Sequence, residues 1–352
     1  MRIPAGIRGR LCILWGLILA PVVFSACNKE ATDKGQPSAL PEIMVVFSPG
    51  GLGDRSYNDQ ILRGIEKAAN EIEEDYYLSF YSPESMEETE MLIEFWWMLK
   101  DIPADEEGNI SRKLLILGSQ EYAEMARDIV DVDELNNDLC ILAFEQDDTG
   151  DETDRIRTFG FCMYGASWLA GRTALELECK KPLVLLGNSA NDTTFDARDG
   201  FMDGYGGEVA SGAFADDFTG YIMANDAYRM MYEYDRDGYD FIYSISGGTN
   251  MGIFRYLREN PFCGIFTAGM DIDQSAYSTL IAGSMVKRID LVLDRYIKDW
   301  IAGKELPRYQ QFDLENGYMD WVIPDRYSYL RPASDALRQE AIEKENAYES
   351  KR

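Results

Sequence analysis

The sequence contains no histidine among its 352 residues. Histidine is the side chain that most often acts as a general base near neutral pH, and it is the commonest protein ligand of metal ions. Its absence excludes catalysis by serine–histidine and cysteine–histidine pairs. Catalysis by a pair of carboxylates remains open as an alternative.

Positive charge is also scarce. The chain has 34 lysine and arginine residues against 62 aspartate and glutamate residues, which gives a net charge of −28. The first 26 residues carry three arginines and no acidic residue, so the remainder carries −28 − 3 = −31. A body with this charge repels the phosphate backbone of DNA and RNA. We therefore predict that the chain has no nucleic-acid partner.

Cysteine is too sparse to suggest a metal centre. Beyond the N-terminal region no two cysteines are close in sequence, so the zinc-site spacing is absent. The acidic stretches 147–152 and 235–238 lack the spacing of a calcium-binding EF-hand. We predict no metal and no cofactor. A disulfide is left open among the four cysteines of this part of the chain, which otherwise resemble buried thiols: Cys140, Cys162, Cys179 and Cys263.

The N-terminus has an apolar run that is too short to span a bilayer permanently. Three arginines precede an apolar stretch from Leu11 to Phe24, and small residues come before Cys27. This is the pattern of a signal peptide, and residues 24–27 resemble the lipobox of bacterial lipoproteins. We predict a signal peptide over 1–26, lipid attachment at Cys27 and a polar tether over 27–41, which would place the protein in the cell envelope. The alternative is an ordinary secretory signal with an incidental cysteine.

Past the tether, short apolar runs alternate with amphipathic segments. This alternation predicts βαβ units and parallel sheets that are covered on both faces. The pattern restarts near residue 181, which predicts two similar α/β lobes. A long helix is expected over 285–302, with Ser284 as its N-cap and Lys287 in its first turn. The end of the chain, 335–352, is expected to form a charged, solvated helix or a frayed tail.

Polar residues gather where predicted strands end. A glycine loop, 50–53, follows the first strand and leads to a helix for which Ser56 is a plausible N-cap. In open α/β sheets, ligands bind at the carboxyl ends of strands. Carboxylates and amides at these positions suit a neutral, hydroxyl-rich ligand, although each alone could be a turn or cap residue. The candidates are Asp54, Ser56, Asn58, Glu145, Gly247, Gly248, Thr249, Asp271, Asp273 and Lys287.

Several of these stretches resemble one family in the same order along the chain. Residues 54–58 (Asp-Arg-Ser-Tyr-Asn) resemble the Asp-Lys-Ser-Phe-Asn element of the basic membrane protein family, the purine-nucleoside-binding lipoproteins of ABC importers. The resemblance covers 43–303. The other stretches that carry it are 164–171, 198–204, 247–249, 269–274 and 284–288.

The resemblance implies a type I periplasmic-binding-protein fold, with two Rossmann-like lobes joined by a multi-strand hinge. The N-terminal lobe is predicted over 42–160 plus 271–302, and the C-terminal lobe over 161–270 plus 303–330. A charged segment, 331–352, follows. The ligand would be held in a cleft between the lobes and enclosed by hinge closure.

The same resemblance implies roles for individual residues. The ribose hydroxyls would be held by Asn58, Gly247, Asp271 or Asp273, and Lys287. The base would be stacked by an aromatic side chain near Phe47 and by Phe214, and Glu145 stands near the position of the carboxylate that reads the base.

The predicted function is that of a monomeric, lipid-anchored receptor that delivers a nucleoside-like ligand to an ABC permease and is not an enzyme. One alternative is an envelope sensor of the same fold. Another is a glycosidase or nucleosidase that uses Asp54 with Asp271 or Asp273 as an acidic pair.

Overall fold

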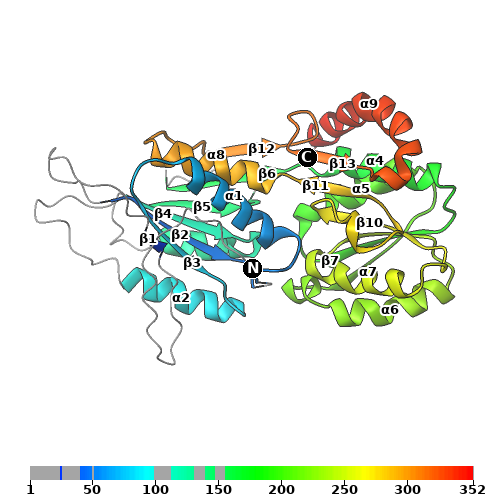
Figure 1. Ribbon diagram of the computed structural model, residues 1–352, viewed down its shortest axis with the longest axis horizontal. Helices are drawn as coiled ribbons and strands as arrows, with labels where there is room; N and C mark the ends of the chain where they lie inside the picture. The colour runs from blue at the N-terminus through cyan, green and yellow to red at the C-terminus, as the bar shows by residue number, and fades with distance from the viewer. Residues whose placement is uncertain are drawn as a thin grey trace, which may run out of the picture. The chain divides into compact units, whose positions relative to one another are not determined.

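The protein is described by a computed structural model over residues 24–25, 40–49, 51–98, 112–130, 139–146 and 155–351 (Figure 1). Cys27, most of the predicted signal and tether, and the acidic stretch 147–152 lie outside these residues. The chain forms two compact units. Unit 1 consists of the described parts of Met1–Leu52, Ile65–Phe159 and Asp294–Gln310; unit 2 consists of those of Gly53–Gly64, Gly160–Leu293 and Gln311–Arg352.

A seven-stranded sheet in the order β1-β3-β2-β4-β5-β6-β12 forms the centre of unit 1. Strands β2 to β6 pair in parallel, and β1 pairs with β3 in the antiparallel direction. The central strands are apolar on both faces, as expected where helices cover both sides. The strands are β1 (Phe24–Ser25), β2 (Glu42–Phe47), β3 (Tyr77–Tyr81), β4 (Lys113–Gly118), β5 (Leu139–Phe144), β6 (Ile156–Phe161) and β12 (Tyr309–Phe312).

Helices α2 (Met86–Met98) and α3 (Ala123–Val130) cover one face of this sheet. Met44, Leu115 and Ile141 point from the strands into the cluster that the helices complete. The turn η2 (Gln120–Tyr122) precedes α3, and the buried hydroxyl of Tyr122 donates to the carbonyl oxygen of Phe47 over 2.8 Å. The core of unit 1 thus reaches the carboxyl end of β2.

Unit 2 contains a six-stranded sheet in the order β13-β11-β10-β9-β7-β8. All its neighbours are parallel except β11 and β13. A hydrophobic cluster between the sheet and the α6 and α7 helices includes Leu185, Ile242 and Leu257. The strands are β7 (Pro182–Asn188), β8 (Ala210–Ala215), β9 (Phe241–Ile245), β10 (Phe266–Asp271), β11 (Ile281–Lys287) and β13 (Met319–Val322).

The helices of unit 2 lie on both faces of its sheet, and Figure 1 shows α6 and α7 together on one side. On the other side α4 packs against α5 through small residues. A β-carbon on Gly204 would lie only 2.1 Å from the carbonyl oxygen of Trp168, so only glycine permits this approach. The helices are α4 (Tyr164–Glu176), α5 (Phe195–Tyr205), α6 (Ala224–Arg236) and α7 (Asn250–Glu259).

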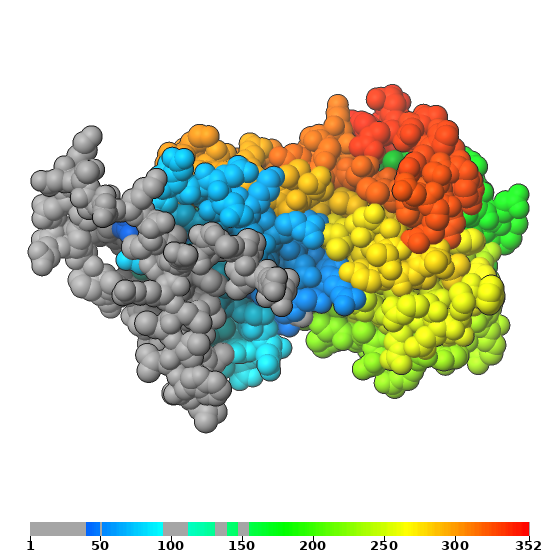
Figure 2. All heavy atoms as spheres, in the orientation of Figure 1, coloured from blue at the N-terminus to red at the C-terminus, as the bar shows by residue number. Residues whose placement is uncertain are grey.

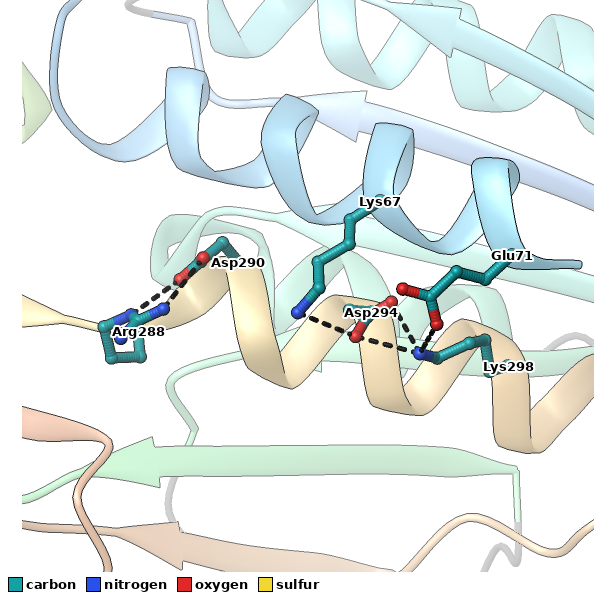
Figure 3. A network of polar contacts seen from close by, with 6 residues as sticks. All are labelled: Lys67, Glu71, Arg288, Asp290, Asp294 and Lys298. Atoms are coloured by element: carbon teal, nitrogen blue, oxygen red, sulfur yellow. Dashed lines mark hydrogen bonds and ion pairs between the residues drawn. The ribbon is translucent and has the colours of Figure 1, made fainter.

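Helices α1 (Tyr57–Glu71) and α8 (Ile289–Ile301) lie side by side. Gly64 permits their contact in unit 2, because a β-carbon there would lie 2.7 Å from the carbonyl oxygen of Asp290. Within unit 1, Figure 3 shows two lysines and two acidic residues of these helices in one network. The Nζ atom of Lys67 lies 3.2 Å from Asp294, and that of Lys298 lies 2.7 Å from Glu71 and 2.9 Å from Asp294. Within unit 2, Arg288 pairs with Asp290 over 3.0 Å (Figure 3).

The predicted helix over 285–302 is wrong at its start. Residues 285–287 continue β11, which pairs with β10 on one side and β13 on the other, and α8 begins only at Ile289. Lys287 is therefore the last residue of a strand and not part of a helical first turn. The predicted end is confirmed, since Gly303 follows α8 with a φ of 74°.

The predicted division of the lobes also differs from the observed units. Residues 271–293 were expected in the N-terminal lobe, but they lie in unit 2 because β11 is an inner strand of its sheet. Residues 53–64 likewise belong to unit 2. The division falls within α1, β6, α8 and β12, so no single loop marks it.

The C-terminal segment is not a frayed tail. Helix α9 (Arg331–Glu349) packs against α4, and Figure 2 shows it in red on the surface of unit 2 beside residues coloured green and yellow. The rings of Tyr348 and Tyr164 stack at 4.5 Å. The buried carboxylate of Glu345 accepts N–H groups of Gly165 over 2.9 Å and Leu314 over 3.1 Å. Burial raises the pKa of Glu345 to about 7.

The remaining whole-chain expectations concern cysteine and the membrane. Cys140, Cys162, Cys179 and Cys263 all carry free thiols. Burial raises the pKa of Cys140 to about 11 and that of Cys179 to about 12, which keeps both thiols protonated. Within the described residues, no helix has the length and apolar character needed to cross a bilayer.

Candidate ligand-binding site

The loop before α1 is organised by the carboxylate of Asp54. One carboxylate oxygen accepts the N–H groups of Ser56 over 2.9 Å and Asp59 over 3.2 Å, and the other accepts that of Asn58 over 2.8 Å. Asp54 therefore satisfies the N–H groups at the start of α1, a role that the sequence had suggested for the side chain of Ser56. Burial raises the pKa of Asp54 to about 6, although the three N–H groups act in the opposite direction.

The hydroxyl of Ser56 instead reaches β10. It donates a hydrogen bond to a carboxylate oxygen of Asp271, the last residue of that strand. Ser56 and Asp271 are 215 positions apart in the sequence, and both are buried in unit 2. The predicted loop residue and the predicted strand-end carboxylate thus lie in one cluster.

Asp271 has a left-handed backbone, with a φ of 65°. The N–H of Ile272 donates to the carbonyl oxygen of Met270 over 2.8 Å, so the three residues form a γ-turn centred on Asp271. A non-glycine residue in this region costs about 1–3 kcal/mol and persists where its surroundings impose it. The turn directs the side chain of Asp271 away from the line of the strand and toward Ser56.

Lys287 ends the neighbouring strand. Its β11 pairs in parallel with β10, and Asp271 is opposite Val286, so Lys287 and Asp271 lie at the same edge of the sheet. The Nζ atom of buried Lys287 lies 5.8 Å from the ring centroid of Tyr57 and 5.6 Å from that of Phe161. Aromatic faces at these distances attract an ammonium ion.

The glycine pair also lies at a strand end of unit 2. Gly247 and Gly248 begin the turn η5 (Gly247–Thr249) directly after β9, the other neighbour of β10. Gly247 has a φ of 50°. A buried network of Ser244, Ser246 and Asn250 supports this turn, with a hydroxyl–hydroxyl distance of 2.7 Å and a Ser246–Asn250 distance of 2.8 Å.

The two alternatives for the ribose carboxylate are placed differently. Asp271 is buried in the cluster, whereas Asp273 is exposed and accepts the N–H of Ser275 over 2.9 Å, just before the turn η6 (Ser275–Tyr277). Asp271 is therefore the better candidate. Asn58 is fully buried at the start of α1, next to Tyr57 and one turn before Ile61.

Three other predicted residues belong to a different strand of unit 2 or to unit 1. Phe214 lies on β8, which β9 and β7 separate from β10, and it packs against the hydrophobic cluster under α6 and α7. Glu145 belongs to unit 1, where it follows β5 with a φ of 51° and is 4 % exposed. Phe47 is buried in unit 1, where its ring stacks on Phe80 at 6.1 Å.

Two glutamines that the sequence analysis did not predict also belong to the cluster. The Nε2 atom of Gln60 donates to the carbonyl oxygen of Asp271 over 2.5 Å and also to that of Lys287. Gln274 accepts the N–H of Met270 over 2.8 Å and donates to the carbonyl oxygen of Arg55 over 3.0 Å. Gln60 lies four positions after Ser56, which directly precedes α1, so the two side chains are on the same side of the start of the helix. This spacing was the sequence feature that could have indicated Gln60.

Tyr57 and Phe161 were also missed. Tyr57 begins α1 within the stretch that carries the family resemblance, so its position was visible in the sequence. Phe161 ends β6 and is remote in sequence from both Tyr57 and Lys287. No local pattern could have revealed that its ring lies near Lys287.

Comparison with known proteins supports the fold. No family model matches the sequence. A CD4+ T-cell-stimulating antigen of Listeria innocua is 24% identical over 308 residues, which cover 79% of this chain and 80% of the antigen. An ABC transporter solute-binding protein of Aeropyrum pernix K1 has a TM-score of 0.65 at 18% identity, over 88% of this chain and 86% of the other. A transcriptional activator of the comK gene from Bacillus halodurans has a TM-score of 0.61 at 17% identity, over 85% and 98%.

These similarities and the repeated βαβ pattern within each unit define the fold. The chain has the α/β fold of periplasmic binding proteins, with two parallel-dominated sheets flanked by helices. The predicted fold class is confirmed.

Proposed function

We propose that the chain is the substrate-binding protein of an ABC importer, anchored to a membrane through a lipid on Cys27, and that it binds a nucleoside, preferentially a purine nucleoside. The observation that carries the proposal is the cluster of Ser56, Asp271 and Lys287 at neighbouring strand ends of unit 2. The resemblance to the basic membrane protein family and the fold support it.

The chemistry of the cluster suits a pair of ribose hydroxyls. A carboxylate such as that of Asp271 can accept hydrogen bonds from two hydroxyl groups, and the ammonium of Lys287 can donate to the hydroxyl oxygens. Charged groups of both signs make these bonds stronger than those between neutral partners. The carboxylates and the net charge of −28 disfavour a phosphorylated ligand, so the free nucleoside fits better than a nucleotide.

The same geometry argues against hydrolysis by an acidic pair. Both carboxylate oxygens of Asp54 accept backbone N–H groups at the start of α1. A nucleophile or general base needs a lone pair directed at the substrate, whereas both carboxylate oxygens of Asp54 accept hydrogen bonds at the start of the helix. We therefore place Asp54 in support of the loop and propose binding without cleavage.

A sensor of the same fold is the second candidate, since the fold also occurs in a transcriptional activator. The importer proposal includes an ABC permease as partner and a monomeric binding protein. Uptake of radiolabelled nucleoside by cells that carry or lack this gene distinguishes the two. Loss of uptake on deletion supports the importer, and unchanged uptake together with altered gene expression supports the sensor.

The direct test is isothermal titration of the purified protein with purine nucleosides, pyrimidine nucleosides and free ribose, followed by chromatography of the recovered ligand. We expect saturable binding of a purine nucleoside and its recovery intact. Release of free base would contradict binding without cleavage. Absence of binding to every nucleoside would overturn the proposed ligand.

Two matched variants locate the site. Asp271→Asn removes a charge from the cluster, and we expect it to weaken nucleoside binding by about 1–3 kcal/mol because charge-assisted bonds to hydroxyls are lost. Asp273→Asn makes the same chemical change on the exposed side of the same loop and should leave the affinity unchanged. Equal effects of the two variants in titration calorimetry would show that Asp271 has no special role.

A further inference from the structure

We propose that Gln60 and Gln274 are positioning residues. Their carboxamides hold Asp271 in its γ-turn, so that its carboxylate has the binding orientation before the ligand arrives. This inference rests on the proposed function, because it concerns the same site. It adds residues that act through Asp271 and Lys287 and do not themselves contact the ligand.

The first observation is the way in which Gln60 uses its carboxamide. A carboxamide nitrogen has two hydrogens, and Gln60 directs them at the carbonyl oxygens of Asp271 and Lys287, the last residues of β10 and β11. One buried side chain of α1 therefore links the two strand ends that carry the proposed ligand groups. It fixes the separation of Asp271 and Lys287 along the edge of the sheet.

The second observation is that Gln274 makes hydrogen bonds on the other side of the turn. The Oε1 atom of Gln274 accepts the N–H of Met270, directly before Asp271, and its Nε2 atom donates to the carbonyl oxygen of Arg55. The N–H of Gln274 donates to the hydroxyl of Ser284 on β11 over 3.1 Å. Gln274 thus ties the turn both to the neighbouring strand and to the loop that contains Ser56.

The third observation is the backbone itself. Asp271 has a φ of 65° and is not glycine, so its conformation must be imposed by its surroundings. Gln60 holds its carbonyl oxygen, Gln274 holds the preceding N–H, and Ser56 holds its carboxylate. These contacts fix the turn from three sides, which lowers the conformational cost of binding.

The main test uses Gln60→Met, which keeps the length of the side chain and removes both donors. In the ligand-free, full-length protein we expect the peptide that contains residues 268–274 to exchange its amide hydrogens about tenfold faster. We also expect about a tenfold loss of nucleoside affinity. Gln274→Met should have the same two effects, and it replaces Gln60→Met as the test variant if Gln60→Met does not fold.

The control is Thr173→Val on α4, which removes a buried hydroxyl that accepts a hydrogen bond from the indole N–H of Trp321 over 2.8 Å. It should lower the melting temperature without changing the affinity or the exchange of residues 268–274. Should Gln60→Met and Gln274→Met behave like Thr173→Val, the two glutamines only contribute to stability and the proposal is wrong.

A pH profile gives a signature that a stability role would not produce. In Gln60→Glu the carboxylate has no hydrogen to donate at pH 7, but it regains one donor on protonation. The ratio of its affinity to that of the wild type should therefore rise on acidification. The neighbouring ionisable groups Asp54, Asp271 and Lys287 are present in both proteins. A ratio that is constant with pH contradicts the role of Gln60.

These measurements separate the two proposals. If the wild type binds no nucleoside, the proposed function fails, while hydrogen exchange in the ligand-free variants still decides whether the glutamines hold the turn. If the wild type binds and exchange in both variants matches that of the wild type, the positioning inference fails while the proposed function stands.

Discussion

Left-handed backbone conformations at residues other than glycine mark the predicted site. Among the described residues they occur at Arg55, Glu145, Glu178 and Asp271. Glu178 follows the end of α4, where such a conformation commonly terminates a helix. The other three lie in the loop or at the strand ends that the sequence singled out. Residues in this conformation concentrate at functional sites, which supports the choice of Asp271 and Glu145.

The protonation of Asp54 should be visible in the stability of the protein. Its pKa is raised from 3.8 to about 6 in the folded state. A carboxyl with a raised folded-state pKa contributes stability that is fully present below about pH 4 and is lost as the pH rises through about 6. Relative to Asp54→Asn, the free energy of unfolding of the wild type should fall by about 1–3 kcal/mol between pH 4 and pH 7.

Urea unfolding of the two proteins across this pH range measures the difference. Asp59→Asn, which alters a neighbouring carboxylate and keeps that of Asp54, is the control and should retain the fall in stability between pH 4 and pH 7 that Asp54→Asn lacks. Parallel curves for the wild type and Asp54→Asn would show that the carboxyl of Asp54 keeps its ordinary pKa.

For single residues, the sequence revealed polar groups at strand ends but not the hydrogen bonds that hold them in place. Asp271 follows an apolar run, so its placement at a strand end could be predicted, whereas Lys287 was expected in the first turn of a helix and instead ends β11. Ser56 was expected to cap α1, but its hydroxyl binds Asp271 and Asp54 takes the capping role. The choice between these partners depends on a contact across 215 positions, which local patterns do not encode.

Among the elements, the apolar strands and the helices after them were predictable because their periodicity is local. The exceptions have physical causes. Residues 285–287 resembled the start of a helix, but pairing with both β10 and β13 holds them in β11. Strand β12 was missed because Tyr309–Phe312 contains two glutamines and no apolar run, and its neighbour β6 supplies the pairing.

The packing of α4 on α5 predicts a large effect of one methyl group. In Gly204→Ala the new β-carbon would lie 2.1 Å from the backbone oxygen of Trp168, a contact that side-chain rotation cannot relieve. We expect a loss of about 1–3 kcal/mol, which exceeds the gain of about 1 kcal/mol in helix propensity. Gly212→Ala in β8 is the control, because its nearest neighbour would lie at 3.6 Å. Equal melting temperatures for the two variants would contradict this packing.

The docking of α9 predicts that its buried carboxylate is structural. Glu345→Ala leaves the N–H groups of Gly165 and Leu314 without their acceptor and should cost about 1–3 kcal/mol. Glu345→Gln keeps an acceptor oxygen and should cost less. Glu343→Ala changes an exposed residue of the same helix and should be neutral.

Chemical unfolding, followed by the fluorescence of the tryptophans, which include Trp168 on α4, measures these differences. If all three variants unfold at the same denaturant concentration, α9 does not depend on Glu345 for its attachment to α4.

For the whole molecule, composition and the repeated βαβ pattern were enough to predict the fold class. They did not predict the division into units, because residues 53–64 and 271–293 join unit 2 through long-range pairing. The site was predicted in part for the same reason. The proposed ligand groups of unit 2 lie at strand ends. The roles of Gln60 and Gln274 could not be predicted, because their hydrogen bonds form only in the folded structure.

The anchoring of the protein can be tested directly. Cys27→Ser removes the proposed lipid attachment, so the protein should move from the membrane fraction to the soluble fraction of the envelope. Cys12→Ser changes a cysteine within the predicted signal peptide and should leave the protein in the membrane fraction. Mass spectrometry of the mature N-terminus checks the attachment itself, and an unmodified N-terminus upstream or downstream of Cys27 would contradict the prediction.

The interleaving of the two units has a consequence for biosynthesis. Unit 1 needs residues 294–310, and unit 2 needs residues 311–352 to place α9. A ribosome that adds residues from the N-terminus must therefore translate beyond position 310 before even the first unit has all its parts. Folding of domains as they emerge, which is the usual order for multidomain chains, is thus postponed until the last segments of both units have been translated.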